Sequence, residues 1–166
     1  MKRLVFILLA LCLILVGCGA KDPVTPDPNE GLSQAYSFKM KDIEGNEVTL
    51  KSLNDKPIIL NFWASWCPPC KAELGDFEKM YKQYGNKINF VMLSVDEAFS
   101  DALAIAEENG YTFPIYHDAM GEGSFYYSIS SIPQTYFINS DGYITKAYTE
   151  MITEAQLKSG IDTLLK

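Results

Sequence analysis

The sequence is poor in residues that bind metal ions. It contains four cysteines and a single histidine, His117. Cys12 and Cys18 lie close to the N-terminus, so a site in the rest of the chain could use only Cys67, Cys70 and His117. Because a structural zinc site needs four ligands, zinc could be held only between two copies of the chain. We therefore expect no metal ion, and the sequence indicates no other cofactor.

Positive charge is also scarce. Arg3 is the only arginine, and 14 lysines and arginines stand against 21 aspartates and glutamates, a formal net charge of −7. Loss of Lys2 and Arg3 with an N-terminal segment would lower the formal charge by two, to −9. Nucleic acid and anionic lipid head groups are therefore poor candidates as partners. The acidic residues are spread along the sequence, which favours a role in solubility over an interaction face.

The longest apolar run is short. It covers residues 4–16, fewer than the roughly 20 residues that a membrane-spanning helix needs. With Lys2 and Arg3 before it and small residues after it, this run is typical of a secretory signal. The end of the run, Leu-Val-Gly-Cys at residues 15–18, resembles the lipobox of bacterial lipoproteins, in which the chain is cut before the cysteine and the cysteine is lipidated.

We therefore expect residues 1–17 to be a lipoprotein signal peptide and Cys18 to carry a lipid anchor, on an extracytoplasmic lipoprotein of a bacterial cell membrane. Ordinary cleavage after Ala20 is the alternative. Residues 18–35 contain three prolines and almost no large apolar side chain, which predicts a flexible linker. The remaining residues, 36–166, have the usual size of one domain with its own core.

The two cysteines of this domain stand where a predicted strand meets a predicted helix. Residues 57–63 are mostly apolar and rich in β-branched and aromatic side chains, typical of a strand buried on both faces. From Pro69 to about Gly85, apolar residues recur every three or four positions, which predicts an amphipathic helix. A helix N-terminus stabilises a thiolate through its free N–H groups and its dipole. Cys67 is therefore the expected nucleophile, and Cys70, one turn further on, the resolving thiol.

The residues between the cysteines limit how strongly the thiolate is stabilised. Pro68 and Pro69 have no N–H, so the nearest backbone donor left for the Cys67 sulfur is that of Cys70. Strongly oxidising dithiol sites have an unusually stable reduced form. We therefore expect a weaker oxidant, which favours an electron donor. A disulfide between two residues so close in sequence adds little stability, so the pair is expected to react rather than to cross-link.

The other segments alternate between strand and helix patterns. We predict a hairpin over residues 36–50 with its turn near Gly45, a strand over 87–95, a helix over 100–109 ended by Gly110, an extended piece at 113–116, a short helix at 123–128, a hairpin over 134–148 and a helix over 153–166 with Thr153 as its N-cap. The strands at 57–63 and 87–95 with the helix between them form a parallel βαβ unit. This order predicts an α/β fold in which helices flank a central mixed sheet, with an N-terminal hairpin extension.

These features together resemble the thioredoxin fold, and more closely the membrane-tethered TlpA/ResA-like thiol-disulfide oxidoreductases. The resemblance covers nearly all of the predicted domain in the family's order. It rests on residues 60–71 (LNFWASWCPPCK), Glu73, residues 95–96 (VD), 113–114 (FP), 131–135 (SIPQT), 137–138 (FI) and 141–142 (DG). A CxxC pair alone is weak evidence, whereas the whole set is specific. It implies a thioredoxin-like fold and a thiol-disulfide oxidoreductase activity.

The resemblance also implies catalytic roles. Cys67 would attack a substrate disulfide and Cys70 would resolve the mixed disulfide, in agreement with the helix argument. Glu73 matches an acidic residue that lies near the thiols and assists proton transfer. The alternative for Glu73 is a solvated glutamate in the first helical turn. Asn61 stands where cytosolic thioredoxins have a buried aspartate, although asparagine is usual in the TlpA/ResA group, so the Cys70 proton would go to Glu73, to water or to the substrate.

A second group of residues is implied in substrate binding. Pro133 matches the family's cis-proline, beside which the backbone of Ile132 pairs with an extended substrate. Without the resemblance, this proline would be expected in the trans form. Trp66, Pro68 and Pro69 are the other expected substrate-binding residues.

Two positions have no counterpart in the family pattern. Gly75 stands where the group often has proline, which should loosen the helix locally. His117 lies outside the family motifs, and we interpret it as a surface or partly buried residue without a role.

Two other functions use related folds. A thioredoxin-fold peroxidase has a threonine three residues before its reactive cysteine and an activating arginine, whereas this chain has Ala64 and no arginine after Arg3. A copper chaperone usually carries CxxxC with a partner histidine, whereas the spacing here is CxxC. Both are therefore disfavoured.

For a thiol-disulfide oxidoreductase, the sequence leaves open the direction of electron transfer and the identity of the protein partners. As an electron donor, the protein would reduce disulfides in exported proteins, such as apocytochrome c during cytochrome c biogenesis or a methionine sulfoxide reductase. It would receive electrons from a membrane thiol carrier of the CcdA/DsbD type. An oxidant would run the same exchange in reverse. We expect a monomer that contacts the membrane through the lipid on Cys18.

Overall fold

The computed structural model describes residues 28–166, so the predicted signal peptide and Cys18 lie outside the described residues. Residues Gly31–Lys166 form one compact unit. Within residues 28–166, no helix combines the length and the apolar character that crossing a bilayer requires.

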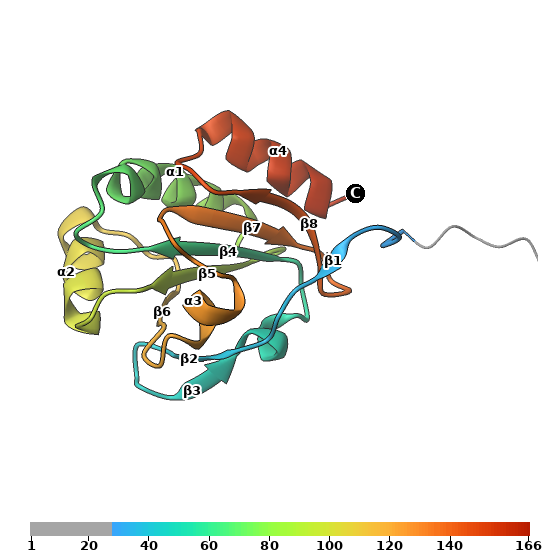
Figure 1. The fold of residues 1–166 in the computed structure, drawn as a ribbon. Helices are drawn as coiled ribbons and strands as arrows, with labels where there is room; N and C mark the ends of the chain where they lie inside the picture. The colour runs from blue at the N-terminus through green and yellow to red at the C-terminus, as the bar shows by residue number, and fades with distance from the viewer. Residues whose placement is uncertain (1–27) are drawn as a thin grey trace, which may run out of the picture. The chain divides into compact units, whose positions relative to one another are not determined.

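An eight-stranded mixed sheet forms the centre of this unit, in the order β1-β8-β7-β4-β5-β6-β2-β3 (Figure 1). Neighbouring strands β4, β5 and β6 are parallel, and the other neighbours are antiparallel. The strands are β1 (Ser33–Gln34), β2 (Lys39–Lys41), β3 (Glu47–Thr49), β4 (Ile58–Trp63), β5 (Asn89–Ser94), β6 (Ile115–His117), β7 (Gln134–Ile138) and β8 (Tyr143–Tyr148). The mixed sheet confirms the predicted thioredoxin-like architecture.

Strand β4 is the central element that leads to the cysteines. All six of its residues are buried, because β5 and β7 flank it in the sheet and both of its faces are covered. Helix α1 (Pro68–Tyr84) follows β4 and leads to the parallel strand β5. The predicted βαβ unit is therefore confirmed, with the cysteines at its strand-to-helix junction.

Helices cover both faces of the sheet. Helices α1, α2 (Phe99–Asn109) and α4 (Glu154–Leu164) contribute to one core cluster, and α1 and α4 lie side by side above the sheet in Figure 1. On the opposite side, α3 (Glu122–Tyr126) lies beside β2, and Tyr127 and Phe38 pack in a second core cluster. Helix α4 approaches β7 closely at Gly160, where an added Cβ would overlap the Phe137 ring.

Local signals position the ends of these helices. Gly110 takes a left-handed conformation (φ 67°) and ends α2 as predicted, because glycine has no Cβ to clash in this conformation. Thr153 is the N-cap of α4, where its hydroxyl accepts the Gln156 N–H and the Gln156 side chain accepts the Thr153 N–H. Helix α1 continues without interruption through Gly75.

The N-terminal part of the unit differs from the predicted boundaries. Strands β2 and β3 pair about a turn in which Gly45 has φ 83°, but β3 ends at Thr49 rather than at Leu50 as predicted, because a 3-10 helix, Leu50–Leu53, begins there. Strand β1 lies within residues 18–35, which were predicted to be linker, and pairs with β8 through Ser33 and Gln34. The linker prediction is wrong for these two residues, because an edge strand forms backbone hydrogen bonds and needs no apolar side chains.

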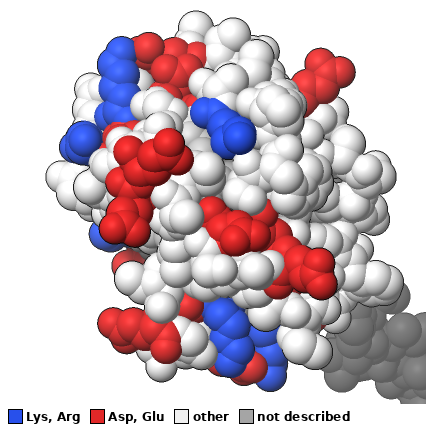
Figure 2. Space-filling view, turned by 90° about the vertical axis from the view of Figure 1, so that its left-hand side faces the viewer, with Lys and Arg blue, Asp and Glu red and all other residues white. Residues whose placement is uncertain are grey.

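The surface near α2 carries charges of both signs. Figure 2, which views the unit from the side on which α2 lies, shows acidic side chains in several separate groups with lysines between them. Three exposed ion pairs are formed within residues 28–166, namely Lys39 with Glu47, Lys79 with Glu154 and Lys158 with Asp162. Exposed pairs of this kind contribute little stability each.

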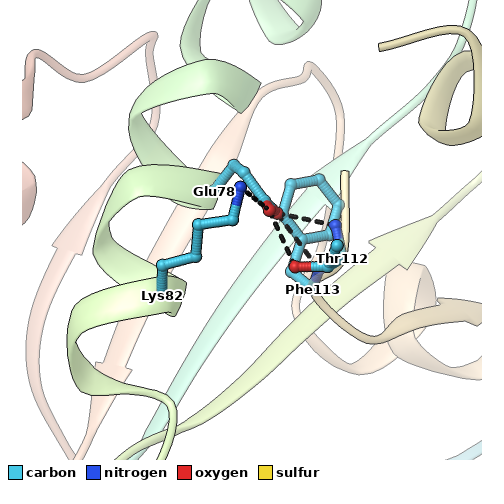
Figure 3. Close-up of polar contacts among 4 residues, drawn as sticks. All are labelled: Glu78, Lys82, Thr112 and Phe113. Carbon is cyan, nitrogen blue, oxygen red and sulfur yellow. Dashed lines mark hydrogen bonds and ion pairs between the residues drawn. The ribbon is translucent and has the colours of Figure 1, made fainter. Parts of the chain in front are cut away.

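A buried carboxylate joins α1 to the segment that precedes β6 (Figure 3). Glu78 accepts hydrogen bonds from the Thr112 N–H (2.8 Å), the Thr112 hydroxyl (2.7 Å) and the Phe113 N–H (3.2 Å), and it pairs with Lys82 at 2.9 Å. Burial alone would raise the pKa of Glu78, but the donors from Thr112, Lys82 and Phe113 outweigh burial and lower it. The carboxylate therefore stabilises the turn that leads into β6.

Candidate active site

Cys67 and Cys70 form a disulfide at the N-terminus of α1. The two Cα atoms are 5.3 Å apart, Cys67 is the N-cap residue, and the prolines Pro68 and Pro69 occupy the first two helical positions. The Cys70 N–H donates to the Cys67 sulfur at 3.2 Å, as an N-cap side chain normally accepts from the third helical residue. The backbone donor predicted for Cys67 is therefore present.

The two cysteines differ little in exposure in this oxidised form. Cys70 is fully buried, as expected for a resolving thiol, but Cys67 is only 3 % exposed, less than predicted for an accessible nucleophile. The Ile132 carbonyl oxygen lies 3.8 Å from the Cys67 sulfur and helps to cover it. Next to the disulfide, Trp66 is 65 % exposed, so an apolar side chain is available to a partner beside a nearly covered sulfur.

The loop before β7 lies against the disulfide. The Ile132–Pro133 peptide bond is cis, as the resemblance implied, and Pro133 is buried while Ile132 is partly buried. Because the Ile132 carbonyl lies against the Cys67 sulfur, residues that are 65 positions apart in the sequence meet at the reactive pair. Pro68 and Pro69 are exposed on the adjoining first turn of α1. The structure thus brings the predicted catalytic and substrate-binding residues of α1 and of this loop together.

Glu73 lies one helical turn after Cys70, on the same face of α1. It is only 1 % exposed, so the alternative of a solvated glutamate is wrong. One carboxylate oxygen accepts a hydrogen bond from the Asn61 side-chain amide and the other accepts one from the Ile152 N–H, both at 2.9 Å. Asn61 also donates to the Thr135 hydroxyl at 2.9 Å. A network of side chains from β4, α1 and β7 therefore holds the carboxyl group in place.

The environment of Glu73 keeps its carboxyl group easy to protonate. Burial raises the pKa of Glu73 from its usual 4.5 to about 7, although the hydrogen bonds from Ile152 and Asn61 act in the opposite direction. Asp76 raises the pKa further through its negative charge. At neutral pH this group can therefore accept a proton and release it again, which is the property required of a general acid–base group.

Asp96 is a further residue that shapes the site, and it received no role from the sequence. Its carboxylate accepts the Ser65 N–H (3.0 and 3.1 Å) and the Ser65 hydroxyl (2.6 Å), two residues before Cys67, and also the Ser94 hydroxyl (2.9 Å). Asp96 therefore fixes the turn between β4 and α1. The Val-Asp pair in the family pattern was the available signal, but the contact to Ser65 spans 31 positions.

His117 is partly buried, within the range predicted for it. Its Nε2 atom lies 2.9 Å from the Asp96 carbonyl oxygen, so Nε2 carries the hydrogen. Its ring stacks on that of Phe99, with centroids 5.0 Å apart. His117 therefore supports the β5–α2 turn. Within residues 28–166, no three His, Cys, Asp or Glu side chains are placed to hold a metal ion together.

The chain is similar in sequence and fold to known proteins. Residues 32–147 match the model of the AhpC/TSA family. The chain is 33% identical over 135 residues to the thiol-disulfide oxidoreductase ResA of Oceanobacillus iheyensis, which covers 78% of this chain and 70% of that protein. It is 32% identical over 156 residues to the sporulation thiol-disulfide oxidoreductase A of Bacillus subtilis, with 91% and 94% covered. The chain belongs to this family of thiol-disulfide oxidoreductases.

A solved structure supports the same conclusion. The crystal structure of StoA from Bacillus subtilis superposes with a TM-score of 0.66 at 32% sequence identity, covering 76% of this chain and 96% of that one. The oxidoreductase assignment of the sequence is therefore confirmed, and the Cys67–Cys70 disulfide is the reactive group that this activity requires.

Proposed function

We propose that the protein is an extracytoplasmic, membrane-anchored reductase of disulfides in exported proteins. The direction of electron transfer is supported by the small number of backbone N–H donors available to the Cys67 sulfur. Pro68 and Pro69 fill the first two helical positions without an N–H, and the Cys70 N–H is the donor that reaches the sulfur. A thiolate with so few donors is stabilised only moderately, so the reduced pair readily gives up its electrons.

The reaction follows from the positions of the two sulfurs. The Cys67 thiolate attacks one sulfur of the substrate disulfide, a mixed disulfide forms, and the other substrate sulfur leaves as a thiolate. Cys70 passes its proton to the Glu73 carboxylate, and its thiolate attacks the Cys67 sulfur. The second substrate sulfur then leaves, so the substrate gains two electrons and the chain returns to the disulfide present in this structure.

A membrane partner would complete the cycle. Two electrons from a membrane thiol carrier of the CcdA/DsbD type would reduce the Cys67–Cys70 disulfide again. Apocytochrome c and methionine sulfoxide reductases are the substrate classes that we propose, because both need reduced cysteines outside the cytoplasm. The proposed anchor is a lipid on Cys18 after removal of residues 1–17, and the mass of the mature N-terminus tests it. A mature chain that starts at Lys21 would contradict the anchor.

The direction of transfer is tested by the reduction potential of the purified protein against a thiol buffer. We expect a potential well below the roughly −120 mV of strongly oxidising dithiol proteins, and a value near that figure would contradict the proposal. Pro69→Ala restores an N–H at the second helical position, from which an N-cap side chain accepts. One hydrogen bond to a charged group contributes about 1.5–3 kcal/mol, so the potential should rise by roughly 30–60 mV.

Pro68→Ala is the matched control for Pro69→Ala. It restores an N–H at the first helical position, which an N-cap side chain does not normally use, and the potential should change much less. Equal shifts in both variants would contradict the role assigned to the missing N–H groups.

The substrates are tested by trapping. Cys70→Ser should hold a client on Cys67 as a mixed disulfide, whereas the control Cys67→Ser should hold none. Mass spectrometry then identifies the captured protein. Equal trapping by the two variants would show that the roles of nucleophile and resolving thiol are assigned wrongly.

A further inference from the structure

We infer that Gln134 and Tyr136 are positioning residues for polypeptide substrates, because they orient the backbone of the loop that faces Cys67. The inference rests on the proposed function, since it concerns how a protein disulfide, rather than a small disulfide, reaches the site. The Gln134 side chain donates to the Ser131 carbonyl and the Tyr136 hydroxyl donates to Gln134, so both act through the main chain of residues 131–133.

Gln134 directly follows this loop, and its side chain bonds back to the first residue of the loop. Its side chain is 5 % exposed, and its amide Nε2 donates to the Ser131 carbonyl oxygen at 2.9 Å. The Ser131 carbonyl and the Ile132 N–H belong to one planar peptide group and point in opposite directions. Fixing the carbonyl therefore fixes the direction of the Ile132 N–H, which has no backbone partner within residues 28–166. The Ile132 carbonyl, in turn, lies 3.8 Å from the Cys67 sulfur.

Tyr136 determines which way the Gln134 amide points. Its hydroxyl donates to Gln134 Oε1 at 2.8 Å, so the amide nitrogen is directed at Ser131 rather than the amide oxygen. The Tyr136 ring packs against Tyr127, with centroids 4.8 Å apart, and against Phe62 at 6.0 Å. The direction of the Ile132 N–H is thus fixed by two hydrogen bonds, from Tyr136 to Gln134 and from Gln134 to Ser131.

This arrangement predicts a difference between two kinds of substrate. A polypeptide that pairs with the Ile132 backbone gains from a fixed N–H and carbonyl, because the backbone of this loop does not have to be ordered on binding. A small disulfide needs only access to the Cys67 sulfur. Loss of the Gln134 and Tyr136 contacts should therefore weaken the reaction with peptides and spare the reaction with small disulfides.

The experiment compares the reduced full-length protein with Tyr136→Phe and Gln134→Met. Second-order rate constants are measured with a synthetic peptide that contains one disulfide within extended flanks, and with 2,2′-dipyridyl disulfide. Tyr136→Phe should lower the peptide rate constant by about three- to tenfold, the range of one neutral hydrogen bond, and Gln134→Met by about tenfold or more. The rate constant with the small disulfide should change by less than about twofold, well below that range.

Tyr127→Phe is the matched control. It also removes a buried tyrosine hydroxyl, which donates to the Tyr36 carbonyl at 3.2 Å and not to the loop, so both rate constants should be retained. Equal losses with both substrates, or no loss with the peptide, would overturn the inference while leaving the proposed function intact. A wild-type protein that reacts with the small disulfide but not with the peptide would overturn both. If Gln134→Met does not fold, Tyr136→Phe, which removes a single oxygen atom, decides the question.

Discussion

Replacing Glu73 with glutamine tests the buried carboxyl group beside the reactive cysteines. Glutamine has the same shape and cannot titrate. Both oxygens of Glu73 accept N–H groups, from Asn61 and from Ile152, whereas glutamine offers one oxygen and one NH₂ group. The variant should therefore leave one buried donor unpaired, which costs about 1–3 kcal/mol at every pH.

The pH dependence gives the more specific result. Burial raises the pKa of Glu73 from 4.5 in the unfolded chain to about 7 in the folded protein. The folded state therefore binds more protons between these values, so the contribution of Glu73 to stability is fully present below pH 4.5 and is lost as the pH rises through 7. A shift of about 2.5 units at 1.36 kcal/mol each corresponds to roughly 3 kcal/mol.

The assay is urea unfolding of the oxidised wild type and Glu73→Gln at several pH values. The difference in unfolding free energy between the two proteins removes the contributions of all other titrating groups. Relative to the wild type, the variant should gain roughly 3 kcal/mol between pH 4.5 and pH 8, so that its deficit at low pH disappears at high pH. A difference that is constant with pH would refute the assigned ionisation of Glu73.

Kinetics of the reduced enzyme separate the catalytic role from the stability effect. Resolution of the mixed disulfide by Cys70 should slow by about a hundredfold in Glu73→Gln, the lower range for a positioned general base. Its pH dependence near 7 should also disappear, because the group that titrates there is gone. An unchanged rate with unchanged pH dependence would show that the Cys70 proton leaves by another route.

Two further pairs of substitutions test how the scaffold around the site is held. Glu78→Ala should lower the unfolding free energy in urea by about 2–3 kcal/mol, because the Thr112 N–H, the Thr112 hydroxyl and the buried Phe113 N–H lose their acceptor. Lys82→Ala removes only an exposed partner and should cost less than about 1 kcal/mol. Equal costs would contradict the role of these hydrogen bonds. Gly160→Ala should cost about 1–3 kcal/mol by forcing a methyl group into the Phe137 ring, while Gly75→Ala, with open space at its Cβ, should stabilise α1 by up to about 1 kcal/mol. Thermal or urea unfolding measures both, and a neutral Gly160→Ala would show that α4 can move away from β7.

The reactive pair could be predicted because its geometry depends on local sequence. An apolar run before Cys67 and a three-to-four repeat after it are sufficient to place the cysteine at an N-cap. The lack of N–H groups in Pro68 and Pro69 then leaves the Cys70 N–H as the donor, which the structure confirms. These statements need no knowledge of the tertiary fold.

The surroundings of the pair could not be predicted in the same way. Buried Glu73 is bonded by the N–H of Ile152, 79 positions further along the chain, and Cys67 is partly covered by the carbonyl of Ile132, 65 positions away. A glutamate in a helix is equally compatible with exposure in the sequence. Strand β1 was missed for a related reason, since its pairing with β8 uses main-chain groups that every residue has.

The position of the carboxyl group has a chemical consequence for the exchange reaction. Closing the Cys67–Cys70 disulfide requires the Cys70 proton to leave a fully buried site. Asn61 cannot take that proton, but its side-chain amide donates to Glu73 and so positions the carboxyl group that we propose as the proton acceptor. Asp76 is the charged residue that shifts the Glu73 pKa, and its negative charge raises that pKa rather than lowering it.

With a pKa of about 7, Glu73 is close to half-ionised at neutral pH. In the proposed reaction it would accept a proton when the disulfide closes and release one when the disulfide is reduced again, at little free-energy cost in either direction. A buried carboxylate paired with a lysine would have a lower pKa and would be a poorer proton acceptor. In the proposed reaction, the same burial that costs stability above pH 7 would let Glu73 take and return the Cys70 proton in a site that has Asn61 where cytosolic thioredoxins have aspartate.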